Sequence, residues 1–225
     1  MRTPLVIFDC DGVLVDSEPI SIGLLVEHCQ NSGFEITEAQ AYKAFLGKPV
    51  VEASKNAKAL FDQKIAPVDL LDFQVKIFDA FRKSLKPVFG ISEALSSLDM
   101  AKCVASSSNL ARIRMSLTLT GLDDHFGEQL FSTDFVQRGK PHPDVFLYAA
   151  KRMNATPNTC IVVEDSPAGI RAAKAAGMPV IGFCGASHSK PAKLKDRLSI
   201  LQPDLLIDDM SNLKSSIEEI YTSSS

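Results

Sequence analysis

The sequence predicts an α/β protein, with a parallel sheet covered by helices on both faces and an all-helical insert after the first strand. From about residue 87 onward, short apolar runs alternate with helical patterns, which is typical of a parallel sheet buried on both sides. Residues 18–85 show helical patterns instead. Polar clusters directly follow the apolar runs, and in such sheets ligands bind beyond the carboxyl ends of the strands.

Composition limits the classes of protein that fit. A chain of 225 residues, 45% of them hydrophobic, can bury a large core in one main domain with a smaller one beside it. The net charge of -3, with scattered basic residues, argues against nucleic-acid binding. No apolar run of the length of a membrane span or signal peptide occurs. Five widely spaced cysteines predict reduced core thiols and a cytoplasmic protein.

The first strand is the apolar run Leu5–Phe8, which stops at Asp9-Cys10-Asp11-Gly12. Two carboxylates at the end of a buried strand are costly unless a positive charge offsets them. Mg²⁺ does so naturally, because it prefers hard oxygen ligands. The alternative is a strand-end turn in which both acids are solvated. A reactive Cys10 is disfavoured, because its anionic neighbours oppose formation of a thiolate.

The insert after this strand is expected to be helical throughout. Its four helices are expected over residues 18–33, 38–46, 51–62 and 69–86. Thr37 and Gln40 resemble a capping box for the second of these helices. The last helix carries a regular apolar stripe along one face.

The remaining strands and helices alternate. Strands are expected over residues 102–105, 130–132, 160–163, 179–184 and 205–207. Helices are expected over residues 92–98, capped by Ser92, and over 110–120, 144–154, 169–177 and 211–220. Because parallel strands present their carboxyl ends at one edge, the residues after them are expected to lie close together.

Three further clusters at strand ends suit phosphoryl transfer, which needs a nucleophile, charge neutralisation, a metal and a proton donor. Ser106-Ser107-Ser108-Asn109 precedes a helix, where hydroxyls and free N–H groups bind anions; an ordinary helix cap is the alternative. Lys140, between Gly139 and Pro141, could neutralise Asp9 and a phosphoryl group, or lie on the surface. Glu164 and Asp165 would repel the first acidic pair unless a cation lay between them.

The motif DxDGxLxDS at residues 9–17, followed in order by Ser106, Lys140 and Glu164-Asp165, resembles the haloacid dehalogenase (HAD) superfamily with a type 1 helical cap. The resemblance implies a Rossmann-like α/β core over residues 1–16 and 87–225. It implies a helical cap domain over residues 17–86, and Mg²⁺ as cofactor. Asp11 is informative, because family members with an aspartate there are phosphatases and phosphomutases, whereas the dehalogenases lack it.

The resemblance also implies a role for each motif residue. Asp9 would be the nucleophile, Asp11 the acid and base, and Lys140 the neutralising cation. Ser106 would bind the phosphoryl group, with further contacts from Ser107 and Asn109. The metal ligands would be the Asp9 and Asp165 side chains and the Asp11 backbone carbonyl, with Glu164 binding directly or through water.

The substrate is less sharply predicted. Lys48, next to Pro49, falls where related caps present a specificity loop and is the candidate for contact with a distal anionic or hydroxylated group; a solvated surface lysine is the alternative. Several stretches, FCGASHSKP among them, resemble the beta-phosphoglucomutase and 6-phosphogluconate phosphatase branch. His188 and Lys190 in that stretch are expected to be loop residues and not site residues.

The predicted function is a Mg²⁺-dependent phosphatase, in a monomer or weak homo-oligomer, that hydrolyses a small phosphorylated sugar or sugar acid through an aspartyl-phosphate on Asp9. The alternative is a beta-phosphoglucomutase-like isomerase that passes the same phosphoryl group to a second hydroxyl. A catalytically idle binding protein on this fold is the third class.

Overall fold

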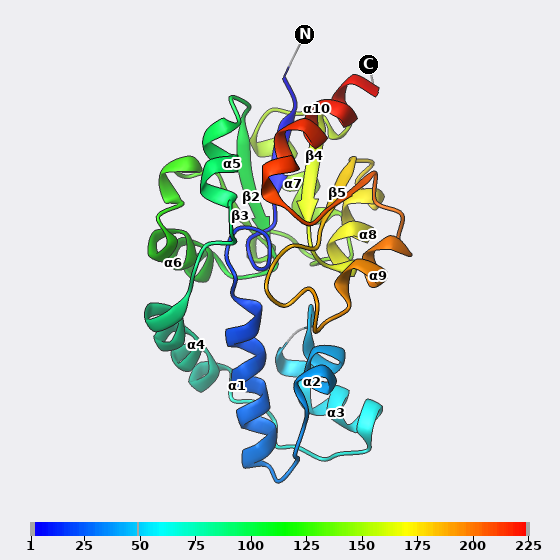
Figure 1. The fold of residues 1–225 in the computed structure, drawn as a ribbon. Helices are drawn as coiled ribbons and strands as arrows, with labels where there is room; N and C mark the ends of the chain where they lie inside the picture. The colour runs from blue at the N-terminus through cyan, green and yellow to red at the C-terminus, as the bar shows by residue number, and fades with distance from the viewer. Residues whose placement is uncertain (1–2, 49, 224–225) are drawn as a thin grey trace.

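Six parallel strands form one sheet in the computed structural model, which describes residues 3–48 and 50–223 (Figure 1). The spatial order is β3-β2-β1-β4-β5-β6. The strands are β1 (Leu5–Phe8), β2 (Lys102–Ser106), β3 (Leu130–Ser132), β4 (Cys160–Glu164), β5 (Val180–Phe183) and β6 (Leu205–Ile207). Strand β1 lies in the middle, where Ile7 is in register with Cys103 on one side and Val162 on the other. The predicted parallel sheet is confirmed.

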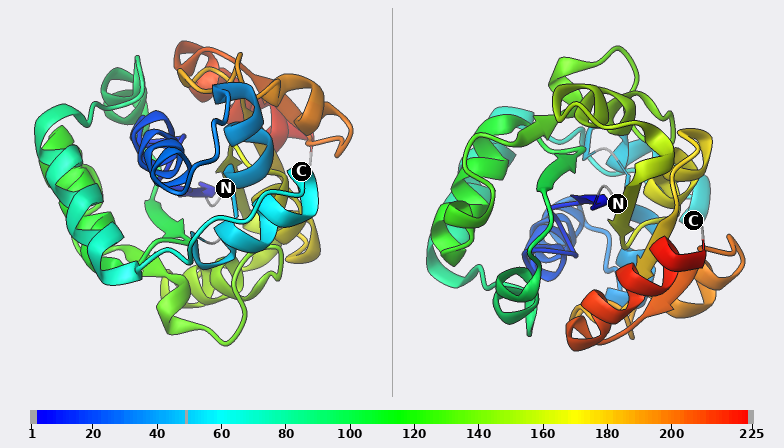
Figure 2. Two further views of the ribbon diagram at one scale, coloured as in Figure 1. Left: turned by 90° about the horizontal axis from the view of Figure 1, so that it is seen from below. Right: turned by 90° about the horizontal axis from the view of Figure 1, so that it is seen from above.

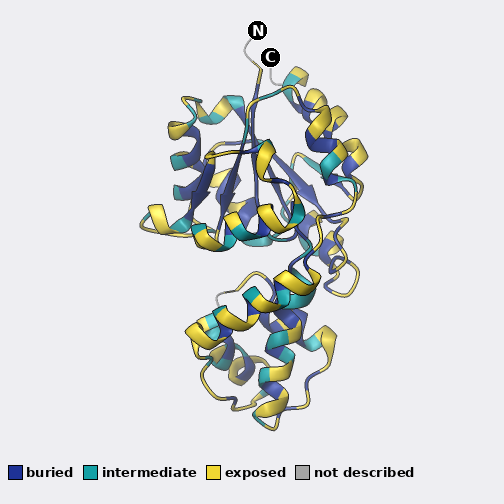
Figure 3. Ribbon diagram, turned by 90° about the vertical axis from the view of Figure 1, so that its left-hand side faces the viewer, coloured by how far each residue is buried: buried dark blue, intermediate teal, exposed yellow. Residues whose placement is uncertain are grey.

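Helices cover both faces of the sheet, as expected (Figure 2). Val6 and Phe8 pack on one face, and Leu5 and Ile7 pack on the other. The first face is covered by α5 (Ile91–Ser97), α6 (Leu110–Thr120) and α10 (Leu213–Ser223), and the second by α7 (Asp144–Arg152), α8 (Pro167–Ala175) and α9 (Leu194–Ser199). Strands buried on both sides need no polar alternation, which is why they are continuous apolar runs in the sequence (Figure 3).

Four helices of the insert lie beneath the carboxyl ends of the strands (Figure 1). They are α1 (Glu18–Asn31), α2 (Glu38–Phe45), α3 (Ala53–Phe61) and α4 (Leu70–Ser84). The expected capping box opens α2: Thr37 N–H donates to Gln40 Oε1 at 2.9 Å, and Gln40 N–H donates to Thr37 Oγ1 at 3.3 Å. The four helices bury their apolar faces against one another and against the same core cluster as α5 and α6.

The chain enters and leaves this insert through two segments that run side by side. Asp16 N–H donates to the Lys86 carbonyl at 2.9 Å, and Val88 N–H donates to the Leu14 carbonyl at the same distance. Ser187, from the loop after β5, adds a hydroxyl bond to Asp16 Oδ1 at 2.8 Å. Backbone pairing therefore holds the two connections together at the base of the insert.

Two local expectations were wrong. Helix α5 begins at Ile91 behind Gly90, which has a φ of 77°, so Ser92 lies inside the helix instead of capping it. Glycine adopts this left-handed conformation without steric cost, which lets the chain turn sharply out of the linker. The six-residue helix α9 was not expected, because it is too short to show a helical period.

The five cysteines all lie in the described chain, buried and free, as the sequence predicted. Burial, and then the charges of Asp11 and Asp9, raise the pKa of the Cys10 thiol well above its usual range. Cys10 is therefore a packed core thiol and not a nucleophile. Among the described helices, none combines the length and apolar character needed to cross a membrane.

Candidate active site

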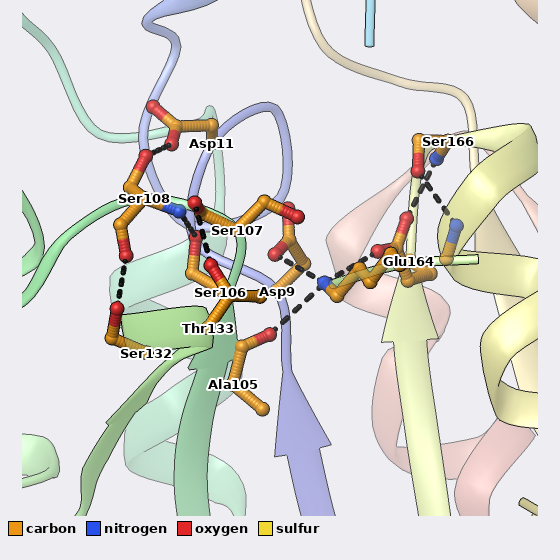
Figure 4. A network of polar contacts seen from close by, with 12 residues as sticks. Asp9, Asp11, Ala105, Ser106, Ser107, Ser108, Ser132, Thr133, Glu164 and Ser166 are labelled. Atoms are coloured by element: carbon orange, nitrogen blue, oxygen red, sulfur yellow. Dashed lines mark hydrogen bonds and ion pairs between the residues drawn. The ribbon is translucent and has the colours of Figure 1, made fainter. Parts of the chain in front are cut away.

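The predicted site residues meet at the carboxyl edge of the sheet. Asp9 follows β1, Ser106 ends β2 and Glu164 ends β4, and these three strands are neighbours (Figure 4). A cavity of about 370 Å³ lies between this edge and the helical insert. Its lining includes all nine residues singled out in the sequence: Asp9, Asp11, Lys48, Ser106, Ser107, Asn109, Lys140, Glu164 and Asp165.

Lys140 is buried at the centre of the site. Its ammonium donates to Asp9 Oδ1 at 2.7 Å, to Glu164 Oε1 at 2.7 Å and to the Ala105 carbonyl at 3.0 Å. Its side chain is 3% exposed, so the surface alternative is wrong. Burial works against the charge, but Asp9 and Glu164 outweigh it and hold the pKa of Lys140 above its usual range. Lys140 is thus a fixed positive charge beside the first aspartate.

Three acids crowd one point of the cavity. One carboxylate oxygen each from Asp9, Glu164 and Asp165 lies within 4.8 Å of the others, and all three residues are buried. Burial raises the pKa of Asp9 well above its usual range, although Lys140 opposes the shift. Burial and then Glu164 raise the pKa of Asp165 in the same way. Such a cluster is stable as anions only beside additional positive charge.

A divalent cation fits these residues. The cluster offers hard oxygen donors, and no donor within the described chain bonds to the Asp11 backbone carbonyl beside it. The residues lining the cavity include five carboxylates and three cationic side chains. With all of them ionised, the lining carries two excess negative charges, which one Mg²⁺ would balance. Mg²⁺ binds through a few carboxylate and carbonyl oxygens together with water and substrate phosphate.

Glu164 lies mainly against other protein groups. Its Oε1 accepts from Lys140, and its Oε2 accepts the Ser166 N–H at 2.7 Å. Gly169, in the first turn of α8, leaves the room for this carboxylate, because a Cβ atom there would overlap it. Gly169 therefore allows the close packing against Glu164, whose Oε1 accepts from Lys140.

Asp11 points away from the acid cluster toward three donors. It accepts the Ser17 hydroxyl at 2.5 Å, the Ser108 hydroxyl at 2.6 Å and the Arg112 guanidinium at 2.7 Å. Burial favours the neutral acid, but Arg112 and the two hydroxyls outweigh it and lower the pKa of Asp11. Ser17 is the N-cap residue of α1, but its hydroxyl donates to Asp11 and makes no capping hydrogen bond to the helix.

Arg112, which the sequence interpretation missed, joins the core to the insert. It belongs to α6, its guanidinium lies 5.0 Å from the centre of the Phe81 ring on α4, and it contacts Ser21 of α1 at 3.4 Å. Both charged side chains of the Arg112–Asp11 pair are largely buried, at 19% and 14% exposure. The Arg112 guanidinium, which keeps Asp11 ionised, is thus held by side chains of the insert as well as of the core.

The residues of the loop after β2 make different contacts. The Ser106 hydroxyl is buried and accepts the Ser108 N–H at 3.1 Å. The Ser107 carbonyl accepts the Thr133 hydroxyl at 3.1 Å, and the residue is exposed to the cavity. Asn109 caps α6 by accepting the Arg112 N–H at 2.9 Å. The helix-cap alternative therefore holds for Asn109, while Ser106 and Ser107 remain available for an anion.

The insert contributes Glu18 and Lys48 to the cavity. Burial, followed by the charges of Asp11 and Asp165, raises the pKa of Glu18 to about 7. Burial, and then Arg197, lower the pKa of Lys48. The neighbouring Pro49 lies outside the described residues.

His188 was expected to lie in a loop away from the site. It does belong to the loop after β5, but it is fully buried and its Nε2 lies 3.1 Å from Asp165 Oδ2. Its nearness to Asp165 is a correction to the sequence interpretation.

Comparison with known proteins agrees with this arrangement. Residues 6–183 match the family model of the haloacid dehalogenase-like hydrolases, and the chain belongs to this family. It is 31% identical to 6-phosphogluconate phosphatase of Escherichia coli K12 over 84% of this chain and 86% of that protein.

Two solved structures are similar over nearly the whole chain. A haloacid dehalogenase-like protein of unknown function from Agrobacterium tumefaciens shares 34% identity with a TM-score of 0.86, covering 97% of this chain and 99% of that one. A HAD family hydrolase from Deinococcus radiodurans, solved with bound phosphate and sodium, shares 27% identity with a TM-score of 0.80, covering 98% and 97%.

Proposed function

We propose that the protein is a Mg²⁺-dependent phosphatase that hydrolyses a small phosphorylated sugar or sugar acid through a phosphoryl-enzyme on Asp9. The observation that carries this proposal is the Lys140 ammonium, which bonds to Asp9 and Glu164 at 2.7 Å beside Asp165. A nucleophile, a fixed cation and a set of metal ligands thereby meet at one point. Similarity to 6-phosphogluconate phosphatase supports the substrate class.

In the first step, an Asp9 carboxylate oxygen attacks phosphorus and the bond to the leaving oxygen breaks. This step requires Asp11 to take up a proton against the lowered pKa that Arg112, Ser108 and Ser17 give it here, and to pass that proton to the leaving oxygen. Lys140 offsets the negative charge of the phosphoryl oxygens, and the Ser106 hydroxyl donates a hydrogen bond to one of them. When bound, Mg²⁺ supplies charge stabilisation for the transferring phosphoryl group, and Asp9, Asp165 and the Asp11 carbonyl would hold it, with Glu164 nearby.

In the second step, water cleaves the acyl phosphate. Asp11, now a carboxylate, takes the proton of the attacking water, and Asp9 is regenerated as phosphate leaves. The three donors that surround Asp11 in this structure favour its ionised form. That arrangement suits the base that this second step requires.

We also propose that residues 17–86 form a cap domain over a core made of residues 1–16 and 87–225. The paired connections at Asp16 and Lys86 support a hinge at these bounds. The cap places Lys48 against the cavity, where it would contact the part of the substrate distant from phosphorus. Closure over the site would exclude water from the first step.

The test is phosphate release from a panel of sugar, sugar-acid and polyol phosphates, with Mg²⁺ and with EDTA. We expect Mg²⁺-dependent free phosphate, and Asp9→Asn should lower turnover by at least about a thousandfold because the covalent route is lost. The panel includes beta-glucose 1-phosphate with a bisphosphate primer. Glucose 6-phosphate without free phosphate would identify an isomerase instead, and undiminished phosphate release from Asp9→Asn would refute the covalent mechanism.

A further inference from the structure

The loop between β5 and α9 carries a buried histidine that the proposed chemistry does not use. This loop leaves the carboxyl edge of the sheet and reaches toward α2 of the insert (Figure 1). His188 is fully buried in it, and neither ring nitrogen forms a hydrogen bond of good geometry within the described chain. Because buried polar atoms are nearly always paired, an imidazole in this state calls for an explanation.

His188 lies against the carboxylate of Asp165. Nε2 lies 3.1 Å from Asp165 Oδ2, and both residues are buried. The ring faces the Tyr42 ring of α2, with centroids 6.4 Å apart and planes at 23°. Gly12 also lies close to the ring: a Cβ atom there would overlap the Asp165 carboxylate and come to 3.0 Å from His188 Cε1. The imidazole is thus in contact with the insert and with the acid that follows β4.

We propose that His188 is a positioning residue: with a divalent cation bound, its Nε2–H donates to Asp165, 3.1 Å away, and so sets the orientation in which this carboxylate meets the cation. The inference rests on the proposed function, because it concerns the metal site of that same reaction. It assigns a role to the stretch FCGASHSKP that the catalytic groups leave unexplained.

Two geometric observations support this assignment. Nε2 is the ring nitrogen that stands within reach of an anion, so the proton belongs there. The Asp165 carboxylate belongs to the cluster with Asp9 and Glu164, and outer groups that bond to a ligand carboxylate fix its orientation.

Calorimetric titration of the full chain with Mg²⁺, without substrate, tests this role. We expect His188→Met to weaken Mg²⁺ binding by about 10- to 100-fold, as for other outer partners of metal ligands. His188→Gln should restore most of the affinity, because the glutamine amide nitrogen can stand close to the position of Nε2. Tyr42→Leu is the control, since it removes the ring contact and should lower the melting temperature while leaving Mg²⁺ affinity within about twofold, well below the loss expected at His188.

His188→Asn covers the case in which His188→Met does not fold. The asparagine side chain is one methylene shorter, so its amide nitrogen takes the place of Nδ1 and should fail to restore binding where glutamine succeeds. Wild-type Mg²⁺ affinity in His188→Met, or equal affinities in the glutamine and asparagine variants, would overturn the inference and leave the proposed function intact. A wild-type chain that binds no Mg²⁺ would overturn both.

Discussion

Glu18 makes the stability of this protein depend on pH in a way that a single substitution can isolate. It stands in the first turn of α1 and lines the cavity, partly exposed. Burial, together with Asp11 and Asp165, raises its pKa from 4.5 to about 7. Between these values the folded chain keeps a proton that the unfolded chain releases, so the free energy of unfolding falls as pH rises.

The size of this effect follows from the shift. A rise from 4.5 to about 7 corresponds to an upper bound of about 3 kcal/mol at 1.36 kcal/mol per pH unit. Because Glu18 is partly exposed, solvent screening reduces this to about 1–2 kcal/mol. Glutamine carries no charge at any of these pH values. The Glu18→Gln variant should therefore match the wild type near pH 4 and become more stable by about 1–2 kcal/mol at pH 8.

Urea unfolding of both proteins in EDTA between pH 4 and 8 measures this difference. The titrations of Asp9 and Asp165 occur in both chains and cancel to first order in the comparison. Glu27→Gln, an exposed position on the same helix, controls for the substitution itself. A stability difference that stays constant with pH, or that favours the wild type at pH 8, would refute the argument.

Two further substitutions test other parts of the site. Arg112→Met leaves the Asp11 carboxylate without its guanidinium partner and should lower the free energy of unfolding by about 3 kcal/mol, the lower end for a buried pair. Urea unfolding with Asp11→Asn in a double-mutant cycle checks this, since simply additive losses would show that the pair is not coupled. Lys48→Ala should raise KM for the best substrate while kcat stays unchanged. Equal kinetic effects on all phosphate esters would remove Lys48 from the specificity loop.

Most of the fold was accessible from the sequence, because its signals are local. Leu5–Phe8 and 160–163 are apolar along their whole length, which is what burial on both faces of a sheet requires. The rule that ligands bind at the carboxyl ends of parallel strands then brought Asp9, Ser106 and Asp165 together. Helix α9 was not predicted, because six residues are too few to display a helical period.

The hydrogen-bond partners of Asp11 could not be predicted in the same way. Ser108 and Arg112 meet Asp11 across separations of 97 and 101 residues, and no local pattern encodes such a contact. His188 could have been predicted from its position, because it follows β5 at the same edge of the sheet as the other polar clusters. The rule that ligands bind beyond the carboxyl ends of parallel strands, applied to β5 as well, would have included it among the site residues.

The central place of β1 sets the order in which the fold can assemble. Its neighbours β2 and β4 begin only at Lys102 and Cys160, far along the chain from β1 (Leu5–Phe8). During synthesis, its apolar run therefore has no strand partner until residues 102–106 have been made, and no second partner until residues 160–164 have been made. Pairing over such sequence distances is slow and leaves hydrophobic segments open to aggregation. The arrangement that brings the cavity residues together therefore leaves apolar segments of the new chain exposed until both partner strands have been made.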